Sequence, residues 1–130
     1  MKNILFVCIE NSNRSQMAQA FAIIHGKDQV NAFSAGSRPS GKVNPKAVSA
    51  MKELGYDLSS HQSKSLEEIP DLTYDCVVTM GCGDECPFVK AENRLDWRIP
   101  DPREMNEEEF RAVRDLVEKK VKELLKTLNP

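Results

Sequence analysis

The hydrophobic pattern begins with a short apolar run and then changes to helical spacing. Ile4 to Val7 are four consecutive apolar residues, which is typical of a short buried strand. Beyond a polar loop, apolar residues recur at i, i+4 and i+7 from Met17 onward, which predicts a helix over 14–25. Gly26 supplies the stop of this helix. The chain therefore starts as strand, polar loop and helix.

Further elements follow with their own boundary signals. The Val-Val centre of the segment 74–80 suits burial on both faces, as in a parallel sheet covered by helices. Asn44 and Pro45 are a typical N-cap and first helical residue, and Asn106 with Glu109 forms a capping-box pattern. The pattern predicts strands over 29–35, 74–80 and 95–99, and helices over 45–54, 66–69 and 107–128.

Apolar faces on the helices indicate what packs on the sheet. Val48, Met51 and Leu54 share one face of the helix that begins at Pro45, and Gly55 ends it. The short helix over 66–69 is predicted from the capping-box pattern that runs from Ser65 to Glu68. The C-terminal helix carries a regular core stripe, made of Phe110, Val113, Val117, Val121, Leu124 and Leu128.

This order of elements predicts an α/β fold. We expect a single domain over 1–130, built as a three-layer sandwich with a four-stranded, mostly parallel sheet flanked by helices. In such a sheet the loops after the first and third strands lie at the same edge. Cys8, the segment from Cys82 to Cys86 and the loop at Asp101 can therefore meet there. Pro100 and Pro102 on either side of Asp101 keep that loop extended.

Composition and charge narrow the partners. A chain of 130 residues with 40% hydrophobic and 29% charged residues is an ordinary globular composition. The net charge of −2 argues against nucleic acid as a main partner, and no apolar stretch approaches a membrane span. A strand begins at once at the N-terminus, so we expect no signal peptide and a cytoplasmic location. We also expect a monomer. In that compartment four cysteines indicate catalysis, metal binding or redox chemistry rather than a permanent disulfide framework.

The loop between the first strand and the first helix predicts a reactive anion site. A strand that turns into a helix points several backbone N–H groups and the positive helix end at one spot. Arg14 can hold two oxygens of a tetrahedral oxyanion, and the same positive field favours the thiolate form of Cys8. Ser12 or Ser15 can donate a hydrogen bond to that sulfur. The residues expected to bind the oxyanion are Ile9, Glu10, Asn11, Ser12, Asn13, Arg14 and Ser15.

Other interpretations of these residues stay open at this point. A cysteine at the end of a strand is often only a small buried hydrophobe, and the loop lacks the glycine-rich run of a nucleotide-binding loop. Cys76, early in the third strand, is interpreted as a core residue. His25 is interpreted as a surface residue, and His61 as a loop residue that forms hydrogen bonds.

Cys82 and Cys86 form a second cysteine cluster. If their segment is helical, the two side chains lie one above the other, slightly too far apart for a disulfide without rearrangement. Gly81, Gly83 and Pro87 make such a rearrangement cheap. Three thiols and a histidine could also bind zinc, but a single C-x3-C pair without a second pair is weak support, so no metal is expected.

Taken together, these motifs resemble the thioredoxin-coupled arsenate reductases, which share the low-molecular-weight tyrosine phosphatase fold. The match runs in order along nearly the whole chain. It consists of Cys8-x5-Arg14-Ser15, Ser34-Ala-Gly36, Asn44-Pro45-Lys-Ala-Val48, Asp75 to Thr79, Cys82-x3-Cys86-Pro87 and Asp101-Pro102.

The resemblance implies a function and a role for each matched residue. Cys8 would attack arsenate held by the loop and Arg14. Cys82 would attack Cys8 and release arsenite, and Cys86 would then form a redox-active Cys82–Cys86 disulfide that thioredoxin, or another thiol donor, reduces. Asp101 would manage a proton at the thiol or the leaving oxygen. No cofactor beyond this disulfide is implied.

The chain also departs from the family pattern. Several such reductases bind potassium through an Asn, a Glu, a Ser and an Asp. Asn11 and Ser34 match, but Gln19 replaces the Glu and Lys64 occupies the Asp position, which argues against a potassium requirement. Asn13 stands where many relatives carry a cysteine.

The alternative function is a low-molecular-weight protein tyrosine phosphatase that uses Cys8, Arg14 and Asp101. Phosphate and arsenate have nearly the same shape and charge, so residual phosphatase activity is compatible with either function. Two features favour the reductase. Arg103 and Glu104 follow Asp101-Pro102 where the phosphatases usually carry tyrosines, and a phosphatase has no use for Cys82 and Cys86.

Overall fold

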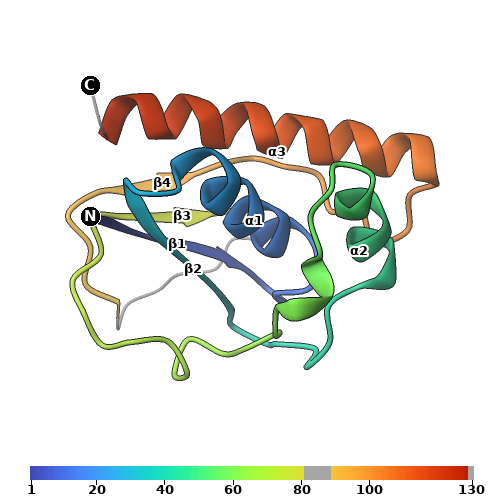
Figure 1. Ribbon diagram of the computed structural model, residues 1–130. Helices are drawn as coiled ribbons and strands as arrows, with labels where there is room; N and C mark the ends of the chain where they lie inside the picture. The colour runs from blue at the N-terminus through green and yellow to red at the C-terminus, as the bar shows by residue number, and fades with distance from the viewer. Residues whose placement is uncertain (81–88, 129–130) are drawn as a thin grey trace.

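The computed structural model describes residues 1–80 and 89–128 (Figure 1). Within them the strands and the three longer helices follow the predicted order, but the predicted helix over 66–69 is absent and a short 3-10 helix, η1, is added. In chain order they are β1 (Lys2–Cys8), α1 (Arg14–Gly26), β2 (Val30–Gly36), α2 (Pro45–Lys52), η1 (Leu58–Ser60), β3 (Cys76–Thr79), β4 (Arg94–Asp96) and α3 (Glu107–Leu128).

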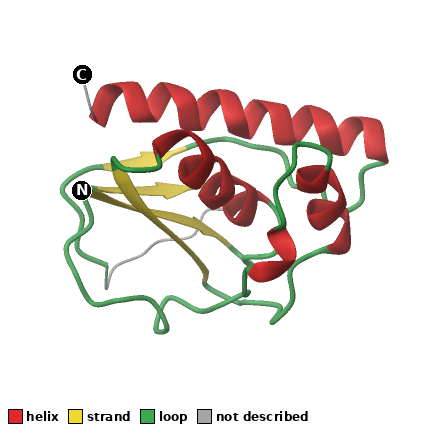
Figure 2. Cartoon of the chain, viewed as in Figure 1, coloured by secondary structure: helices red, strands yellow, loops and turns green. Residues whose placement is uncertain are grey.

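The four strands form one parallel sheet in the order β2-β1-β3-β4 (Figure 2). Cys8 at the end of β1 is paired with Gly36 at the end of β2, and Val7 with Thr79 at the end of β3. The carboxyl ends of three strands therefore meet at one edge. This confirms the predicted α/β fold with a four-stranded sheet, and it places the loop that follows Cys8 in the middle of that edge.

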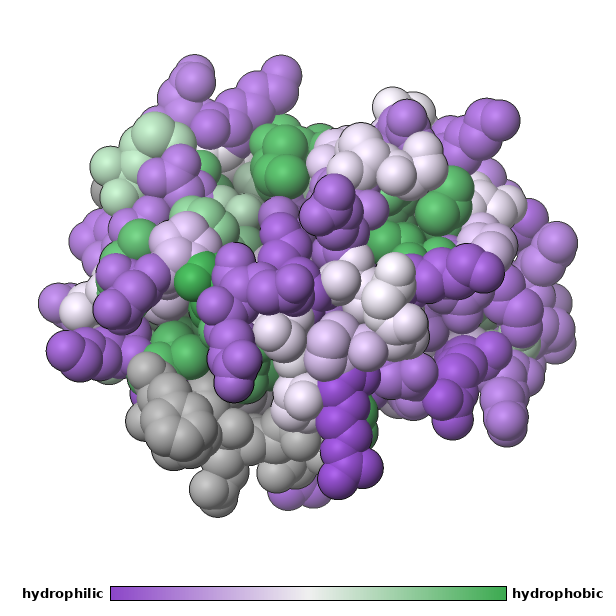
Figure 3. Space-filling model, turned by 90° about the horizontal axis from the view of Figure 1, so that it is seen from below, coloured by the Kyte–Doolittle hydropathy of each residue, from purple (hydrophilic) through white to green (hydrophobic). Residues whose placement is uncertain are grey.

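Alternate residues of β1 and β3 enter two separate cores. Ile4 and Phe6 face α1, α2 and α3, which all contribute to the larger core, and the three helices lie above the sheet in Figure 1. Leu5 and Val7 face the other side, where Tyr74 and residues from the segment 66–72 cover the sheet. Figure 3 looks onto this side from below, and its surface is mainly hydrophilic with apolar groups between. Cys8 belongs to the helix side.

Two predicted helix starts are confirmed in atomic detail. The Asn44 side chain accepts a hydrogen bond of 2.9 Å from Lys46 N, with Pro45 as the first residue of α2. At the start of α3, Glu109 N donates to Asn106 Oδ1 over 2.8 Å, and Asn106 N donates back to Glu109 Oε1 over 3.3 Å. Both helices therefore begin where their side chains satisfy free N–H groups.

Three local expectations are wrong. Ser65 N does donate to Glu68 Oε2 over 2.6 Å, as in a capping box, but the chain forms only a turn there because Pro70 prevents a helix from continuing. Leu54 is 43% exposed, since α2 ends at Lys52 and Gly55, with φ +81°, turns the chain away. The fourth strand is also shorter than predicted and starts one residue earlier.

The described helices show no membrane-spanning character: none of them combines the length and the apolar composition that a crossing requires.

Candidate active site

Cys8 ends β1 directly below the first turn of α1. Its side chain is 3% exposed, and its Sγ lies 2.9 Å from Ser15 Oγ. Of Ser12 and Ser15, the two serines expected to donate a hydrogen bond to the sulfur, Ser15 is the one that contacts it. The sulfur sits where the sheet edge meets the positive end of a helix, which is a favourable place for a negative charge.

Three carbonyl groups of the loop over 9–13 bind the segment that follows β2. Ile9 O accepts from Arg38 N over 2.8 Å, Glu10 O accepts from Ser40 N over 3.0 Å, and Ser12 O accepts from Asn44 N over 3.1 Å. In a trans peptide the next N–H points opposite to the carbonyl, so the amides of residues 10, 11 and 13 point away from the segment after β2. This is the arrangement of a backbone anion site.

Gly36 permits this close approach. A Cβ at residue 36 would collide with the backbone oxygen of Ile9, and it would lie only 2.9 Å from Asn11 N. Gly36 N itself donates to Lys64 O over 2.9 Å. The glycine that ends β2 therefore lets the neighbouring strand and the segment at residue 64 pack directly against the loop.

Asn11 holds the loop from within. It is fully buried and adopts φ +51°, a left-handed conformation that asparagine tolerates. Its Nδ2 donates to Ser15 Oγ over 2.8 Å, and its Oδ1 accepts from Gln16 Nε2 and from Lys64 N, each over 2.9 Å. The amide thereby supports the same serine that contacts the Cys8 sulfur.

Arg14 is buried and fixed, yet only part of its guanidinium is used by the protein. Its Nη1 donates to Met80 O and to Ile99 O, each over 2.8 Å. Its Nη2 lies 4.0 Å from Asp101 Oδ2. Among the described residues these hydrogen bonds engage only Nη1, which leaves Nε and Nη2 for an anion in the cavity. Met80 also marks where the chain enters the segment of Cys82.

Charged side chains surround the opening of the site. The exposed Asp101 accepts a hydrogen bond of 3.0 Å from Arg103 N through Oδ1, and Arg103 Nη1 lies 2.7 Å from Glu10 Oε2. The resulting cavity has a volume of about 390 Å³, and it is lined by Cys8, Ile9, Glu10, Ser12, Asn13, Arg14, Arg38, Asp101 and Arg103. Asn13 Oδ1 is buried and has no hydrogen-bond partner within the described part of the chain.

The structure thus brings together most of the residues expected from sequence. Cys8, Arg14 and Asp101 share one cavity with all of the loop residues 9–13 except Asn11. Asn11 and Ser15 are fully buried and do not line it. Cys82 and Cys86 lie outside the described residues. Sequence reasoning missed Arg38 and Arg103 as lining residues. Their position in the sequence could have indicated them, because both lie in loops that leave the carboxyl edge of the sheet.

The positions that resemble a potassium site do not fit a cation. Ser34 Oγ donates to Gln19 Oε1 over 2.6 Å, and Gln19 Nε2 donates to Ala32 O over 3.1 Å. Asn11 Oδ1 already accepts two hydrogen bonds, one of them from the backbone of Lys64. The amide oxygens of Gln19 and Asn11 thus already accept hydrogen bonds from protein donors, and the Ser34 hydroxyl is the donor to Gln19. Residues 1–80 and 89–128 also contain no group of three or more His, Cys, Asp or Glu side chains that could hold a metal.

The remaining cysteine and the two histidines lie as predicted. Cys76 is 1% exposed in the core, and burial raises the pKa of its thiol to about 11, so it stays a neutral thiol. His25 Nε2 lies 2.8 Å from Glu118 Oε2 between α1 and α3, away from the cavity. His61 forms hydrogen bonds to Gln16 and Tyr56.

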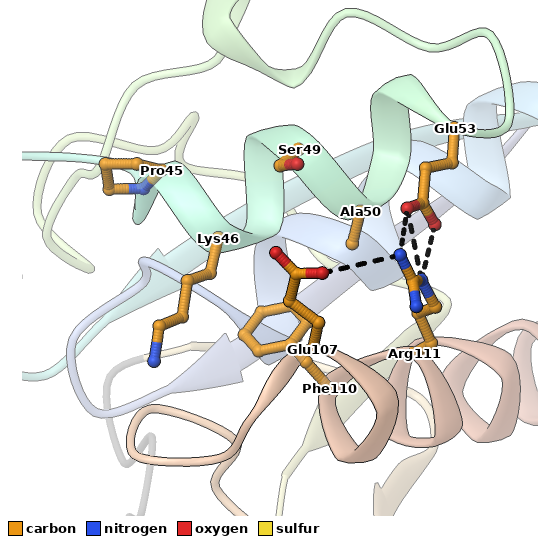
Figure 4. Close-up of a pocket in the computed structure, with 8 residues that line it drawn as sticks. All are labelled: Pro45, Lys46, Ser49, Ala50, Glu53, Glu107, Phe110 and Arg111. Carbon is orange, nitrogen blue, oxygen red and sulfur yellow. Dashed lines mark hydrogen bonds and ion pairs between the residues drawn. The ribbon is translucent and has the colours of Figure 1, made fainter.

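A second cavity of about 230 Å³ lies between α2 and the start of α3 (Figure 4). Glu53 and Arg111 face each other at one end of it, with Arg111 Nη2 2.8 Å from Glu53 Oε2. Phe110 closes its floor and is 2% exposed. Lys46 Nζ donates to the carbonyls of Arg103 and Met105. These groups join the two helices to each other.

Comparisons with known proteins agree with this geometry. The model of the low molecular weight phosphotyrosine protein phosphatase family matches residues 3–130. A glutaredoxin arsenate reductase of Synechocystis sp. is 38% identical over 128 residues, covering 96% of this chain and 97% of that protein.

Solved structures give the same result. An arsenate reductase in the phosphate binding state superposes with a TM-score of 0.91 at 37% identity, covering 99% of this chain and 100% of that one. A thioredoxin-dependent arsenate reductase of Corynebacterium glutamicum superposes with a TM-score of 0.80 at 29% identity, covering 98% of this chain and 62% of that one. The chain therefore belongs to the low molecular weight phosphotyrosine protein phosphatase family, and it shares this fold with arsenate reductases, as its motifs predicted.

Proposed function

We propose that this protein reduces arsenate to arsenite, with Cys8 as the nucleophile. The observation that carries the proposal is the shared cavity of Cys8, Arg14 and Asp101, lined also by a loop with three carbonyls bound to the segment after β2. A tetrahedral oxyanion in this cavity would meet the thiolate on one side and the Arg14 fork on another. Arsenate is such an anion, and the relatives named above are arsenate reductases.

The first step forms a sulfur–arsenic bond. The Cys8 thiolate attacks arsenic(V), and one oxygen leaves as water after it takes a proton. Asp101 supplies that proton, since its carboxyl group stands at the mouth of the cavity 4.0 Å from Arg14. Arg14 and the loop amides balance the negative charge of the remaining oxygens.

The second step transfers two electrons to arsenic. The Cys82 thiolate attacks the Cys8 sulfur, the electron pair of the sulfur–arsenic bond stays with arsenic, and arsenite leaves. Cys86 then attacks Cys82 and releases the Cys8 thiolate, leaving a Cys82–Cys86 disulfide. Both cysteines lie outside the described residues. The role of Cys82 is supported by Met80, two residues before it, whose carbonyl oxygen accepts a hydrogen bond from Arg14 in the active site.

A dithiol protein must regenerate the enzyme, and we propose thioredoxin. One relative is named for thioredoxin dependence and another for glutaredoxin, so the thiol donor is the part of the proposal that differs among relatives. Such chemistry requires a reducing compartment, which favours a cytoplasmic location. No potassium ion enters any step, because the oxygens that would hold it already accept hydrogen bonds or belong to Ser34 and Gln19, which pair with each other.

The cavity favours a small inorganic oxyanion over phosphotyrosine. Its described lining contains three arginines and no aromatic side chain that could stack on an aryl group. The catalytic loop alone does not distinguish phosphate from arsenate. Residual phosphatase activity on small aryl phosphates is therefore compatible with the proposal, whereas phosphopeptides should be poor substrates.

Disulfide mapping after one turnover tests the proposed sequence of bonds. Reduced protein is mixed with arsenate without thioredoxin, and non-reduced peptides are identified by mass spectrometry. Wild type should give a Cys82–Cys86 disulfide, Cys86→Ser should accumulate a Cys8–Cys82 disulfide, and Cys8→Ser should give neither. Cys76→Ala is the matched control, because this fourth cysteine lies in the core and should leave the pattern unchanged.

Turnover with thioredoxin, thioredoxin reductase and NADPH completes this test. Cys8→Ser should lose arsenite production entirely, because a serine hydroxyl is not ionised at neutral pH. Full multiple-turnover activity in Cys82→Ser would contradict the proposed electron transfer. Replacing thioredoxin with glutathione and glutaredoxin in the wild-type assay identifies the donor.

A further inference from the structure

A continuous chain of side-chain hydrogen bonds leads from the half-buried segment after α2 to the sulfur of Cys8. It joins two parts of the sequence that are more than 40 residues apart. Every contact in it is between 2.6 and 2.9 Å. We call it the donor chain, and its members are Tyr56, His61, Gln16, Asn11, Ser15 and Cys8.

The inner part of the donor chain has a fixed direction. The backbone N–H of Lys64 donates to Asn11 Oδ1, so the Asn11 amide must present Nδ2 to Ser15 Oγ. Ser15 then accepts from Asn11, and its hydroxyl hydrogen is free to point at the Cys8 sulfur 2.9 Å away. A thiolate accepts such a bond, and a thiol has less need of it. The direction therefore favours the ionised sulfur.

The outer part is fixed by the amide of Gln16. Its Nε2 is surrounded by three oxygens: Asn11 O at 3.0 Å, Asn11 Oδ1 at 2.9 Å and Gln62 O at 2.9 Å. Its Oε1 must consequently face His61 Nδ1, which lies 2.9 Å away and has to carry the hydrogen. In a neutral imidazole, Nε2 is then the acceptor, and Tyr56 donates to it over 2.6 Å.

The surroundings keep His61 neutral. Burial and, next, the nearby charge of Lys64 lower the pKa of this imidazole, while Asp57 acts weakly in the opposite direction. Burial raises the pKa of Tyr56, so its hydroxyl keeps its hydrogen. The Tyr56 ring also meets the His61 ring edge-on, with the centroids 5.5 Å apart. One tautomer of His61 is thereby selected, with each donor in the chain pointing toward Cys8.

We propose that His61 and Tyr56 are positioning residues for Cys8, which act by holding Gln16, Asn11 and Ser15 as a one-directional series of donors to the thiolate. Each bond in such a series polarises the next one. Loss of the outer donors loosens Gln16, and with it the Asn11–Ser15 contact that faces the sulfur. The proposal rests on the proposed function, in which the Cys8 thiolate is the nucleophile.

The test compares two substitutions of His61 that differ in one donor. His61→Leu removes the group that donates to Gln16 Oε1, whereas the amide of His61→Asn can place a donor near the position of Nδ1. The probe is iodoacetamide, and the alkylation rate of Cys8 in the reduced protein is followed against pH by peptide mass spectrometry. This readout needs neither arsenate nor thioredoxin.

We expect Cys8 of His61→Leu to be alkylated about fivefold more slowly at pH 7, the equivalent of one lost hydrogen bond, and its pH profile to move to higher pH. The kcat for arsenate should fall by a similar factor. His61→Asn should stay within about twofold of wild type, and Tyr56→Phe should lie between the two, because it releases the tautomer of His61 without removing the Nδ1 donor.

Two matched controls lie elsewhere in the fold. His25→Leu removes a histidine that pairs with Glu118, and Tyr74→Phe removes a hydroxyl that donates to Pro70 O. Both should leave the Cys8 profile unchanged.

The outcomes separate the donor chain from a merely structural role. Equal shifts in His61→Leu and His61→Asn, or no shift in either, would overturn the proposal. A shift in His61→Leu alone supports it. If Cys8 of wild type itself reacts no faster at pH 7 than a cysteine in a short peptide, the proposed function fails. The donor chain then has no reactive thiolate to stabilise, and this proposal fails with it.

Discussion

Two buried arginines of this protein have the same exposure and opposite uses. Arg14 in the active-site loop and Arg114 in α3 are each 7% exposed. Arg114 donates through Nη1 to Ala50 O and Glu53 Oε1 and through Nε to Asp115 Oδ1, so its charge is paired and its fork is engaged on two sides. Arg14 donates through Nη1 to two neutral carbonyls, and within the described part of the chain its nearest carboxylate, that of Asp101, stands 4.0 Å away.

The difference shows what marks a functional buried charge. A buried guanidinium is costly unless it is paired, so a structural arginine is expected to look like Arg114. Arg14 has a fixed position but an incompletely balanced charge, and it lines a cavity of about 390 Å³ next to a thiol. An oxyanion supplies the missing partner. Burial by itself therefore does not distinguish the two arginines. What distinguishes Arg14 is that it lines a cavity and that, among residues 1–80 and 89–128, its hydrogen bonds use only Nη1.

The same contrast holds for the regions around the two arginines. At the active-site loop a run of buried polar residues, from Asn11 to Gln16, is held by hydrogen bonds that converge on one sulfur. At the α2–α3 junction, Glu53 binds Arg111 and Arg114 together, and the cavity beside them in Figure 4 ends in that closed ion pair. The first region is organised to receive a ligand, and the second joins two helices.

Replacing each arginine by lysine gives the largest expected effect and tests this contrast directly. Lysine keeps the charge but loses the planar fork. Arg14→Lys should lower kcat/KM for arsenate about 100- to 1,000-fold, the usual cost of losing an oxyanion donor. Arg114→Lys should leave kcat/KM nearly unchanged and lower the free energy of unfolding by about 1–3 kcal/mol, because the buried Ala50 O and the Glu53 carboxylate lose their donor. Turnover assays and urea unfolding of both variants measure this.

A similar loss of turnover in the two variants would contradict the distinction. Arg14→Lys should also lose some stability, since Met80 O and Ile99 O lose a donor. The comparison therefore rests on activity measured well below the unfolding transition of each variant, and on phosphate binding by calorimetry, which only Arg14→Lys should weaken.

The carboxylates beside the two arginines give the next effect. Asp101→Asn removes the proposed proton donor and should lower arsenate turnover about 100-fold at neutral pH. Phosphate should bind at least as well as in wild type, because a negative charge facing the anion is removed. Asp115→Asn is the matched control: its carboxylate contacts Arg114, is 61% exposed on its side chain and lies in α3. A normal turnover rate in Asp101→Asn would remove Asp101 from the mechanism.

How far the sequence predicts this molecule depends on whether a feature is local. The strand to Cys8, the loop to Arg14 and the N-caps at Asn44 and Asn106 were predictable, because each is fixed by residues a few positions apart. Ser65 and Glu68 formed their predicted hydrogen bond, but the helix failed because Pro70 ends it. Local sequence signals therefore predicted individual hydrogen bonds more reliably than they predicted the lengths of helices.

Features that depend on distant segments were not predictable. The position of Arg38 after a strand end indicated the sheet edge but not the contact of its backbone N–H with Ile9 O, and His61 reaches Gln16 from 45 positions away. No pattern within a few residues of either one indicates such a contact. Gln16 itself looked like an ordinary first-turn residue of a helix, and its buried amide acquires a role only when the segment over 61–64 packs against the loop.

The smallest effect concerns pH and the ion pair of the α2–α3 junction. Hydrogen bonds from Arg111 and then from Arg114 lower the pKa of Glu53 from 4.5 to about 2. The folded protein therefore holds this carboxylate ionised at pH values where the unfolded chain binds a proton. Its contribution to stability is complete above about pH 4.5 and is lost as the pH falls toward 2.

Glu53→Gln should melt below wild type at pH 7 with unchanged arsenate turnover. The difference in Tm between the two proteins should narrow below pH 4.5 and nearly close at pH 2. Glu107→Gln is the control, since its side chain is 88% exposed and its oxygen lies 3.7 Å from Arg111, so little gap is expected at any pH. A gap that stays constant down to pH 2 would mean that Glu53 stabilises the junction by packing rather than by its charge, and the contrast between the junction and the active-site loop would then lose its electrostatic basis.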